Sequence, residues 1–194
     1  MKLVISTVLS VFLIAGAATA QHANIGIKGG LNAYTLKTDD NSAADAKISF
    51  HVGLLGHFHI TGNFALQPEI IYSVQGASYN MSGTDVRLNL NYINVPLLFQ
   101  YMFDNGFRLQ AGPQLGLLAS AKSQVNNNKT DVKANFETID LGLAIGASYV
   151  NPSSNFGFDI RYNLGLSNIN ANSNVNSFNR GLQAGVFYLF KHKS

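Results

Sequence analysis

The feature of this sequence that most limits its fold is a long hairpin over residues 86–122, whose two arms meet at Asp104-Asn105-Gly106. In the second arm, apolar residues alternate with polar or small ones from Phe107 to Leu117. This period of two is a strand signal, because successive side chains of a strand point to opposite faces. The turn residues tolerate positive φ angles, as a tight hairpin requires. The chain therefore contains at least two antiparallel strands, each with one apolar face.

The same alternation recurs along the rest of the chain. The segments that show it are 24–36, 48–60, 64–80, 86–103, 107–122, 137–150, 156–169 and 180–190. Four connections are short (61–63, 81–85, 104–106 and 151–155), whereas those at 37–47, 123–136 and 170–179 are long and polar. Outer-membrane barrels typically have short turns on one rim and longer loops on the other, and only 81–85 departs from that order. We therefore expect an all-β protein, an eight-stranded antiparallel up-and-down transmembrane β-barrel.

The first arm of the hairpin contains a change of phase. Its apolar row stands at even positions as far as Tyr92 and at odd positions from Ile93. A β-bulge adds one residue to a strand and would let both rows share a face. We therefore expect a bulge near Tyr92 and Ile93.

The first twenty residues have the form of an export signal. Lys2 precedes an almost entirely apolar stretch from Leu3 to Ala15, and Ala18-Thr19-Ala20 is a small-x-small cleavage site. We expect residues 1–20 to be a signal peptide and residues 21–194 to form the barrel domain. No later stretch approaches the ~18 continuous apolar residues of a spanning helix, so membrane residence must be by strands.

Charge is sparse in this chain. Charged residues make up 12 % of it, against about 25 % in typical soluble domains. Because a surface in water needs charge to stay dispersed, part of this surface is expected to face lipid. The net charge is only +3 and no basic run is interleaved with aromatic residues, which argues against nucleic acid as a partner. The absence of cysteine excludes a disulfide scaffold.

The polar faces of the strands are expected to line the barrel interior. They are rich in Gly, Ser, Asn, Gln and Ala, and they carry few ionisable groups. Those groups are Lys28, Glu69, Arg108, Asp140, Asp159 and Arg161. Equal numbers of positive and negative charges suit a packed interior, where an unpaired charge is costly. We predict that these residues form a polar network in the lumen, with a structural role, since side chains fill an eight-stranded barrel.

Aromatic residues gather near the short turns and the C-terminus, as a girdle at one membrane interface would. They are Phe58, Phe64, Tyr101, Phe103, Phe107, Tyr149, Phe156, Phe158, Tyr188 and Phe190.

Four segments carry a resemblance to a known family. They are residues 24–32 (NIGIKGGLN), 66–77 (LQPEIIYSVQGA), 91–98 (NYINVPLL) and 111–114 (AGPQ). In this order they resemble the PorT-family outer-membrane β-barrel domain over essentially the whole mature chain. The resemblance implies the fold and the outer-membrane location. It implies no activity, although the member that names the family belongs to a secretion apparatus.

Catalytic and metal sites are not predicted. His51, His57 and His59 share one strand face and could bind a metal, but no acidic residue stands on that strand, and packing beside lumen polar groups is the favoured interpretation. The acidic loop with Asp39, Asp40 and Asp45 lacks the EF-hand spacing. No nucleophile motif or triad is recognisable. We expect a non-enzymatic protein without cofactors.

The expected function is that of a monomeric integral outer-membrane protein with periplasmic termini. Its partners would be outer-membrane lipid and, through the loops, other envelope or secretion proteins or surface ligands. The role would be structural, adhesive or secretion-associated. One alternative is a narrow solute or ion channel. Another is a secreted lipocalin-like carrier, in which the apolar rows would line a cavity for an apolar ligand.

Overall fold

The computed structural model describes residues 23–38, 45–81, 84–126, 128–172 and 175–190. The strands are β1 (Ala23–Thr38), β2 (Asp45–His59), β3 (Phe64–Met81), β4 (Thr84–Met102), β5 (Phe107–Val125), β6 (Asn128–Asp131), β7 (Ile139–Val150), β8 (Phe156–Gly165) and β9 (Ser177–Leu189). A 3-10 turn, η2, covers Lys133–Asn135. No helix in the described part of the chain is long and apolar enough to span a membrane. The predicted signal peptide, the loop residues 39–44 and the tail 191–194 lie outside the described residues.

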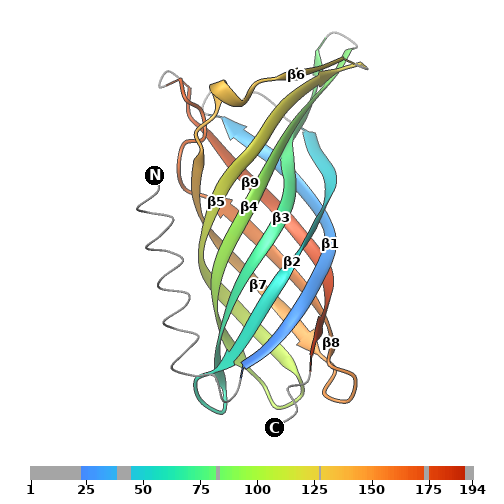
Figure 1. The fold of residues 1–194 in the computed structure, drawn as a ribbon, viewed down its shortest axis with the longest axis vertical. Helices are drawn as coiled ribbons and strands as arrows, with labels where there is room; N and C mark the ends of the chain where they lie inside the picture. The colour runs from blue at the N-terminus through green and yellow to red at the C-terminus, as the bar shows by residue number, and fades with distance from the viewer. Residues whose placement is uncertain (1–22, 39–44, 82–83, 127, 173–174, 191–194) are drawn as a thin grey trace.

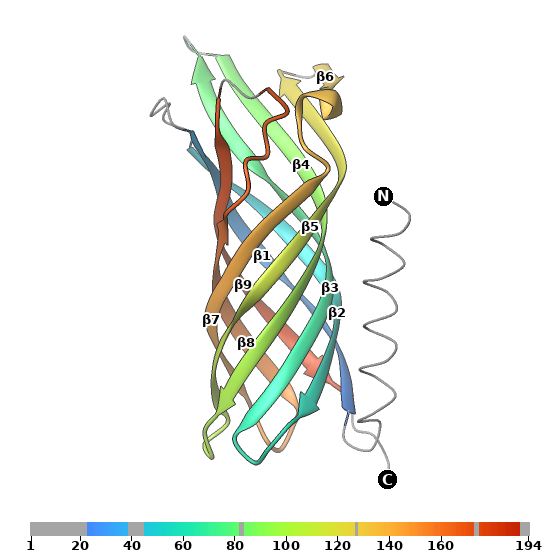
Figure 2. The same cartoon turned by 90° about the vertical axis from the view of Figure 1, so that its left-hand side faces the viewer.

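Eight of the strands close into a ring. Their order is β4-β3-β2-β1-β9-β8-β7-β5, and pairing of β4 with β5 completes the circle. All pairings are antiparallel, and β1 joins the last strand, β9. The strands run steeply tilted around a tall barrel (Figures 1 and 2). β6 pairs only with β5 and stands outside the ring. The predicted all-β, eight-stranded antiparallel barrel is confirmed.

The two rims differ. At one, which we call the short-turn rim, tight connections join β2 to β3, β4 to β5 and β7 to β8 (Figure 1). At the other, the long-loop rim, β3, β4 and β5 rise above the remaining strands because they contain 18, 19 and 19 residues. β6 and η2 follow β5 at the top of this extension (Figure 2).

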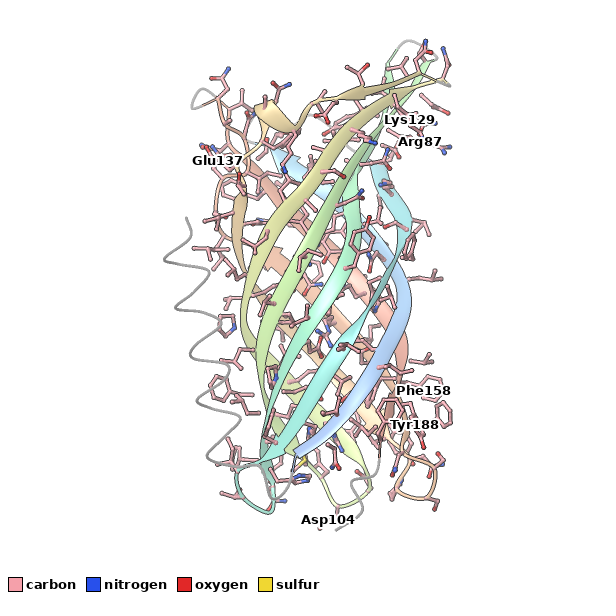
Figure 3. All side chains as sticks on the ribbon, in the orientation of Figure 1. Arg87, Asp104, Lys129, Glu137, Phe158 and Tyr188 are labelled. Carbon is pink, nitrogen blue, oxygen red and sulfur yellow. The ribbon has the colours of Figure 1, made fainter. Side chains whose placement is uncertain are left out.

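The outer wall of the barrel is apolar. Large hydrophobic side chains are exposed on every strand of the ring, among them Ile27, Val52, Ile70, Phe99, Leu109, Ile145, Ile160 and Val186. Soluble proteins rarely expose a continuous apolar surface of this kind, whereas lipid requires one. Figure 3 shows side chains standing out from the barrel wall along its height. Since the apolar rows lie outside, the carrier alternative, in which they line a cavity, is wrong.

Aromatic rings form two contacting arcs near the short-turn rim. In one, Tyr101 lies 5.2 Å from Phe64 and 4.9 Å from Phe103 between ring centroids. In the other, Tyr188 lies 4.8 Å from Phe156 and 5.3 Å from Phe190. Figure 3 shows Tyr188 beside Phe158 on the lower wall. These arcs have the position of an interfacial girdle.

The expected facing of β4 is wrong in its first half. β4 alternates without interruption, so that Leu90 and Tyr92 are buried in the interior while Ile93 and the odd positions after it point outward. Its ladder with β3 is likewise continuous from Asn94 to Thr84. The apolar row of residues 86–92 is therefore internal. It contributes to an apolar cluster that fills the upper barrel, and this explains why an inward-facing row is apolar there.

An irregularity does occur at the predicted level, but its extra residue belongs to β5. Asn91 pairs with Ser120 and Tyr92 pairs with Leu118, which leaves Ala119 without an opposite residue. Buried positions of β5 are even as far as Leu118 and then include Ala121. The bulge therefore turns the upper part of β5 so that Ala121 reaches the apolar cluster.

Insertion of one alanine after Ala121 is expected to misface the top of β5. Lys122 would then point inward beside Leu88, because a one-residue slip exchanges the two faces. Limited proteolysis should cut within residues 120–136 much faster than in the wild type, while the lower barrel keeps its heat-modifiable migration in gels. Deletion of Ala119 is the control, because it removes the bulge but leaves Ala121 inward and should be protected as the wild type is. Equal protection of the insertion variant and the wild type would contradict this account.

Candidate functional site

The predicted ionisable residues all point into the barrel. Lys28, Glu69, Arg108, Asp140, Asp159 and Arg161 are all buried. They come from β1, β3, β5, β7 and β8, where each stands on the inward row of its strand. The structure brings four of them together in one cluster and leaves the other two, Arg108 and Asp140, apart from it.

The ion cluster consists of Lys28, Glu69, Asp159 and Arg161. Arg161 donates to both Glu69 oxygens in a bidentate pair, from Nη1 at 2.8 Å and from Nη2 at 2.9 Å. It also donates to Asp159 Oδ2, from Nη2 at 2.6 Å and from Nε at 3.1 Å. Lys28 Nζ donates to the same Asp159 oxygen at 2.7 Å and lies 3.5 Å from Glu69 Oε2. The cluster thus connects β1, β3 and β8 across the lumen.

Charge within the ion cluster is balanced. Two cations meet two carboxylates, and the side chains are almost completely excluded from solvent. Burial of ions is tolerated when each is paired and its hydrogen bonds are satisfied. Gly146 makes room for this arrangement, because a Cβ there would lie 2.7 Å from Arg161 Cβ. The cluster therefore forms an internal cross-link between β1, β3 and β8.

Arg108 and Asp140 lie toward opposite ends of the barrel. On β7, Ser148 stands opposite Arg108, and Asp140 itself stands opposite Gly116. Eight strand residues separate these levels, or about 26 Å at ~3.3 Å per residue. Asp140 accepts hydrogen bonds from Asn179 Nδ2 at 2.7 Å and Ser167 Oγ at 3.1 Å. Arg108 Nη1 lies 3.5 Å from His57 Nδ1.

A chain of glutamines extends the ion cluster toward the short-turn rim. Gln67 Nε2 donates to Glu69 Oε1 at 2.7 Å, and Gln100 Nε2 donates to Gln67 Oε1 at 3.0 Å and to Gln110 Oε1 at 2.9 Å. The network predicted from the sequence contains only charged residues, and these neutral members are additional to it. The signal for them was present, since Gln67, Gln100 and Gln110 stand on the inward rows beside charged positions.

Neutral polar contacts also surround the histidines. His51 Nδ1 lies 2.8 Å from Asn32 Oδ1, which also accepts from Gln183 Nε2 at 3.1 Å. The rings of His57 and His59 meet edge to face with centroids 4.7 Å apart. Among the described residues no group of three His, Cys, Asp or Glu side chains is placed to hold a metal ion.

Apolar clusters stand on both sides of the ion cluster. Toward the short-turn rim the lower cluster contains Leu55, Val150, Phe187 and Leu189. Toward the long-loop rim the upper cluster contains Leu36, Ala77, Leu90, Tyr92, Leu118, Ala121 and Ile169. A lumen filled with salt bridges and apolar side chains suits a stable core more than a solute path.

Comparison with known proteins agrees with this architecture. Residues 19–171 match the model of a family described as outer membrane protein beta-barrel domain. The crystal structure of Neisserial surface protein A is similar with a TM-score of 0.57 and 18 % identity, over 88 % of this chain and 100 % of that chain. Ail, the attachment invasion locus protein of Yersinia pestis, is similar with a TM-score of 0.51 and 16 % identity, over 87 % of this chain and 100 % of that chain. At these identities the likeness concerns the fold.

A search of curated proteins gave no match. The family match covers most of the chain and agrees with the closed ring, the apolar outer wall and the polar lumen. The chain belongs to the outer membrane protein beta-barrel domain family, and it is an outer-membrane β-barrel.

Proposed function

We propose that this protein is a non-enzymatic outer-membrane barrel that acts through its long-loop rim, with an adhesive role at the cell surface. The observation that carries the proposal is the filled lumen, in which the ion cluster spans β1, β3 and β8 between two apolar clusters. Solute transport is disfavoured by such an interior. The extension above the barrel wall is then the part available for binding.

The long-loop rim offers a polar binding surface. Lys122, Lys129 and Asp131 are exposed on the paired strands β5 and β6, and Figure 3 shows Lys129 and Arg87 at the top of the extension. A hollow of about 720 Å³ beside them is lined by residues that include Asn135, Phe136 and Asn170. Amide groups beside an aromatic ring can bind polar ligands that also present an apolar face.

We also propose an orientation for the barrel in the outer membrane. Outer-membrane barrels place short turns in the periplasm and long loops outside, so we assign the long-loop rim to the cell exterior and both termini to the periplasm. The Yersinia protein of similar fold is named for attachment and invasion. Its likeness to this chain is one of fold alone.

Whole-cell adherence tests the proposal. One variant replaces residues 126–134 by Asn-Gly and so removes β6 with most of η2, and the matched control replaces residues 151–155 on the opposite rim in the same way. Cells carrying the first variant should adhere to host-cell monolayers or to neighbouring bacteria much less than cells carrying the wild type or the control. An epitope placed at residues 128–131 should bind antibody on intact cells. Unchanged adherence, or an epitope hidden until lysis, would contradict the proposal.

A secretion-associated role is the second candidate. It is favoured by the four segments that resemble the PorT family, two of which lie on β3 and β4. Chemical cross-linking in intact cells distinguishes the two roles. A secretion component should be recovered cross-linked to other envelope proteins, whereas a surface adhesin should not.

The purified protein is expected to form no channel. Planar bilayers containing the wild type should show no conductance steps at any voltage, because the ion cluster and both apolar clusters fill the lumen. A water-filled porin of known conductance serves as the positive control. Discrete steps from the wild type would restore the channel alternative.

A further inference from the structure

The mouth of the barrel at the short-turn rim contains a buried cation that has no counter-ion among the described residues. Arg108 is only 9 % exposed, yet it forms no salt bridge within 4.0 Å of any described carboxylate. Arg161 and Lys28, by contrast, each contact Glu69 and Asp159. Asp140, the remaining buried acid of the predicted network, lies at the opposite end. A buried charge left uncompensated is strongly unfavourable, so the mouth should have an affinity for an anion.

A cavity opens beside this cation. It has a volume of about 370 Å³ and is lined by Arg108, His57 and His59, together with residues of the turns and of the C-terminal strand. This volume is ample for a small oxyanion. Arg108 therefore reaches a space that solutes can enter from the short-turn rim.

Several neighbours of Arg108 can donate hydrogen bonds. His57 Nδ1 accepts from Arg108 Nη1, so the neutral ring carries its proton on Nε2. Gln110 Nε2 and Ser148 Oγ, on the same ladder as Arg108, are buried without a partner among the described residues. Asp104 is the acidic residue that lines the cavity, and it lies on the exposed turn at the bottom of the barrel (Figure 3). The interior of the mouth thus carries a cation and unpartnered donors, with one unpartnered acceptor, Gln100 Oε1, on the neighbouring strand.

We propose that the short-turn mouth binds a small free oxyanion, of the phosphate or sulfate class, on the guanidinium of Arg108. The planar guanidinium presents paired N–H donors that match two oxygens of such an ion. His57 contacts one guanidinium nitrogen, Nη1, and the other N–H donors are left for the ligand. The site is independent of the adhesive role, because it lies on the opposite rim.

Protection of Arg108 from an arginine-specific reagent tests the site in the wild-type protein. Full-length barrel in a phosphate-free maltoside detergent is treated with phenylglyoxal, with and without inorganic phosphate at matched ionic strength, and the modified arginines are mapped by mass spectrometry. At a phosphate concentration about nine times Kd, modification of Arg108 should slow about tenfold, because one site in ten remains free. Arg87, exposed on the other rim, should react at an unchanged rate.

Three results would overturn the proposal: failure of Arg108 to react at all, equal reaction with and without phosphate, or equal slowing at Arg87. Broadening of the phosphorus resonance of phosphate should disappear in Arg108→Gln and persist in Arg108→Lys and Arg87→Gln. If Arg108→Gln does not fold, the reagent measurement on the wild type still decides. Repetition in phosphocholine micelles identifies the source of the anion, since a headgroup phosphate that occupies the site would protect Arg108 before phosphate is added and so contradict a free ion.

Discussion

Arg161→Met is expected to lower the free energy of unfolding by about 3–5 kcal/mol, the usual cost of removing one partner from a buried ion pair. Arg161 is fully enclosed and donates to both Glu69 and Asp159. Its loss leaves Lys28 as the only cation of the ion cluster, so that two carboxylates, both almost completely excluded from solvent, share a single partner. The measurement is urea unfolding in lipid vesicles, followed by tyrosine fluorescence and by heat-modifiable migration.

Two further variants separate charge imbalance from loss of volume. Arg87→Met removes an exposed arginine and should change stability by no more than about 0.5 kcal/mol. A variant that neutralises the whole cluster, with Lys28→Met, Glu69→Gln, Asp159→Asn and Arg161→Met, should recover most of the lost stability, since apolar or neutral replacement of a complete buried ion group is often tolerated. If Arg161→Met is as stable as Arg87→Met, the ion cluster is not the internal cross-link described above.

Ile145→Arg is expected to cost about 2–4 kcal/mol in a bilayer, as charged residues do on the lipid face near the midplane of a barrel. Ile145 is 58 % exposed at the middle of β7, where it pairs with Ala111 and Tyr162. The guanidinium would have to remain in hydrocarbon or distort the bilayer to reach water. Urea unfolding in vesicles gives the cost.

Leu166→Arg is the matched control for that substitution. Leu166 is 55 % exposed, but its backbone N–H binds Leu141 O, four residues nearer the long-loop rim than Ile145. Near the interface the same change should cost about 0–1 kcal/mol. Equal effects at the two positions would show that the apolar wall is not embedded at the depth assigned to it.

The facing of a strand is predicted correctly from the sequence where its polar row faces the lumen and its apolar row faces lipid. On β1, β3 and β8 the polar row is internal throughout, and Lys28, Glu69 and Asp159 lie in the lumen as expected. It fails on β4, where Leu90 and Tyr92 face inward although they are apolar. An apolar row faces either lipid or an apolar interior, and the pattern of one strand does not distinguish them. The extra residue, Ala119, lies on the neighbouring strand β5. Its position likewise depends on how β4 and β5 pair, and the pattern of one strand does not contain it.

The class of this protein follows from its sequence, because strand alternation, turn chemistry and low charge are local properties that each segment carries alone. Which lumen side chains meet depends on how the strands close into the ring. Lys28 and Asp159 are 131 residues apart, and they touch because β1 and β8 flank β9 in the closed ring. The stagger of that ring sets the level of every inward residue, and for this reason it joined four of the predicted charges and left Arg108 alone at the short-turn mouth.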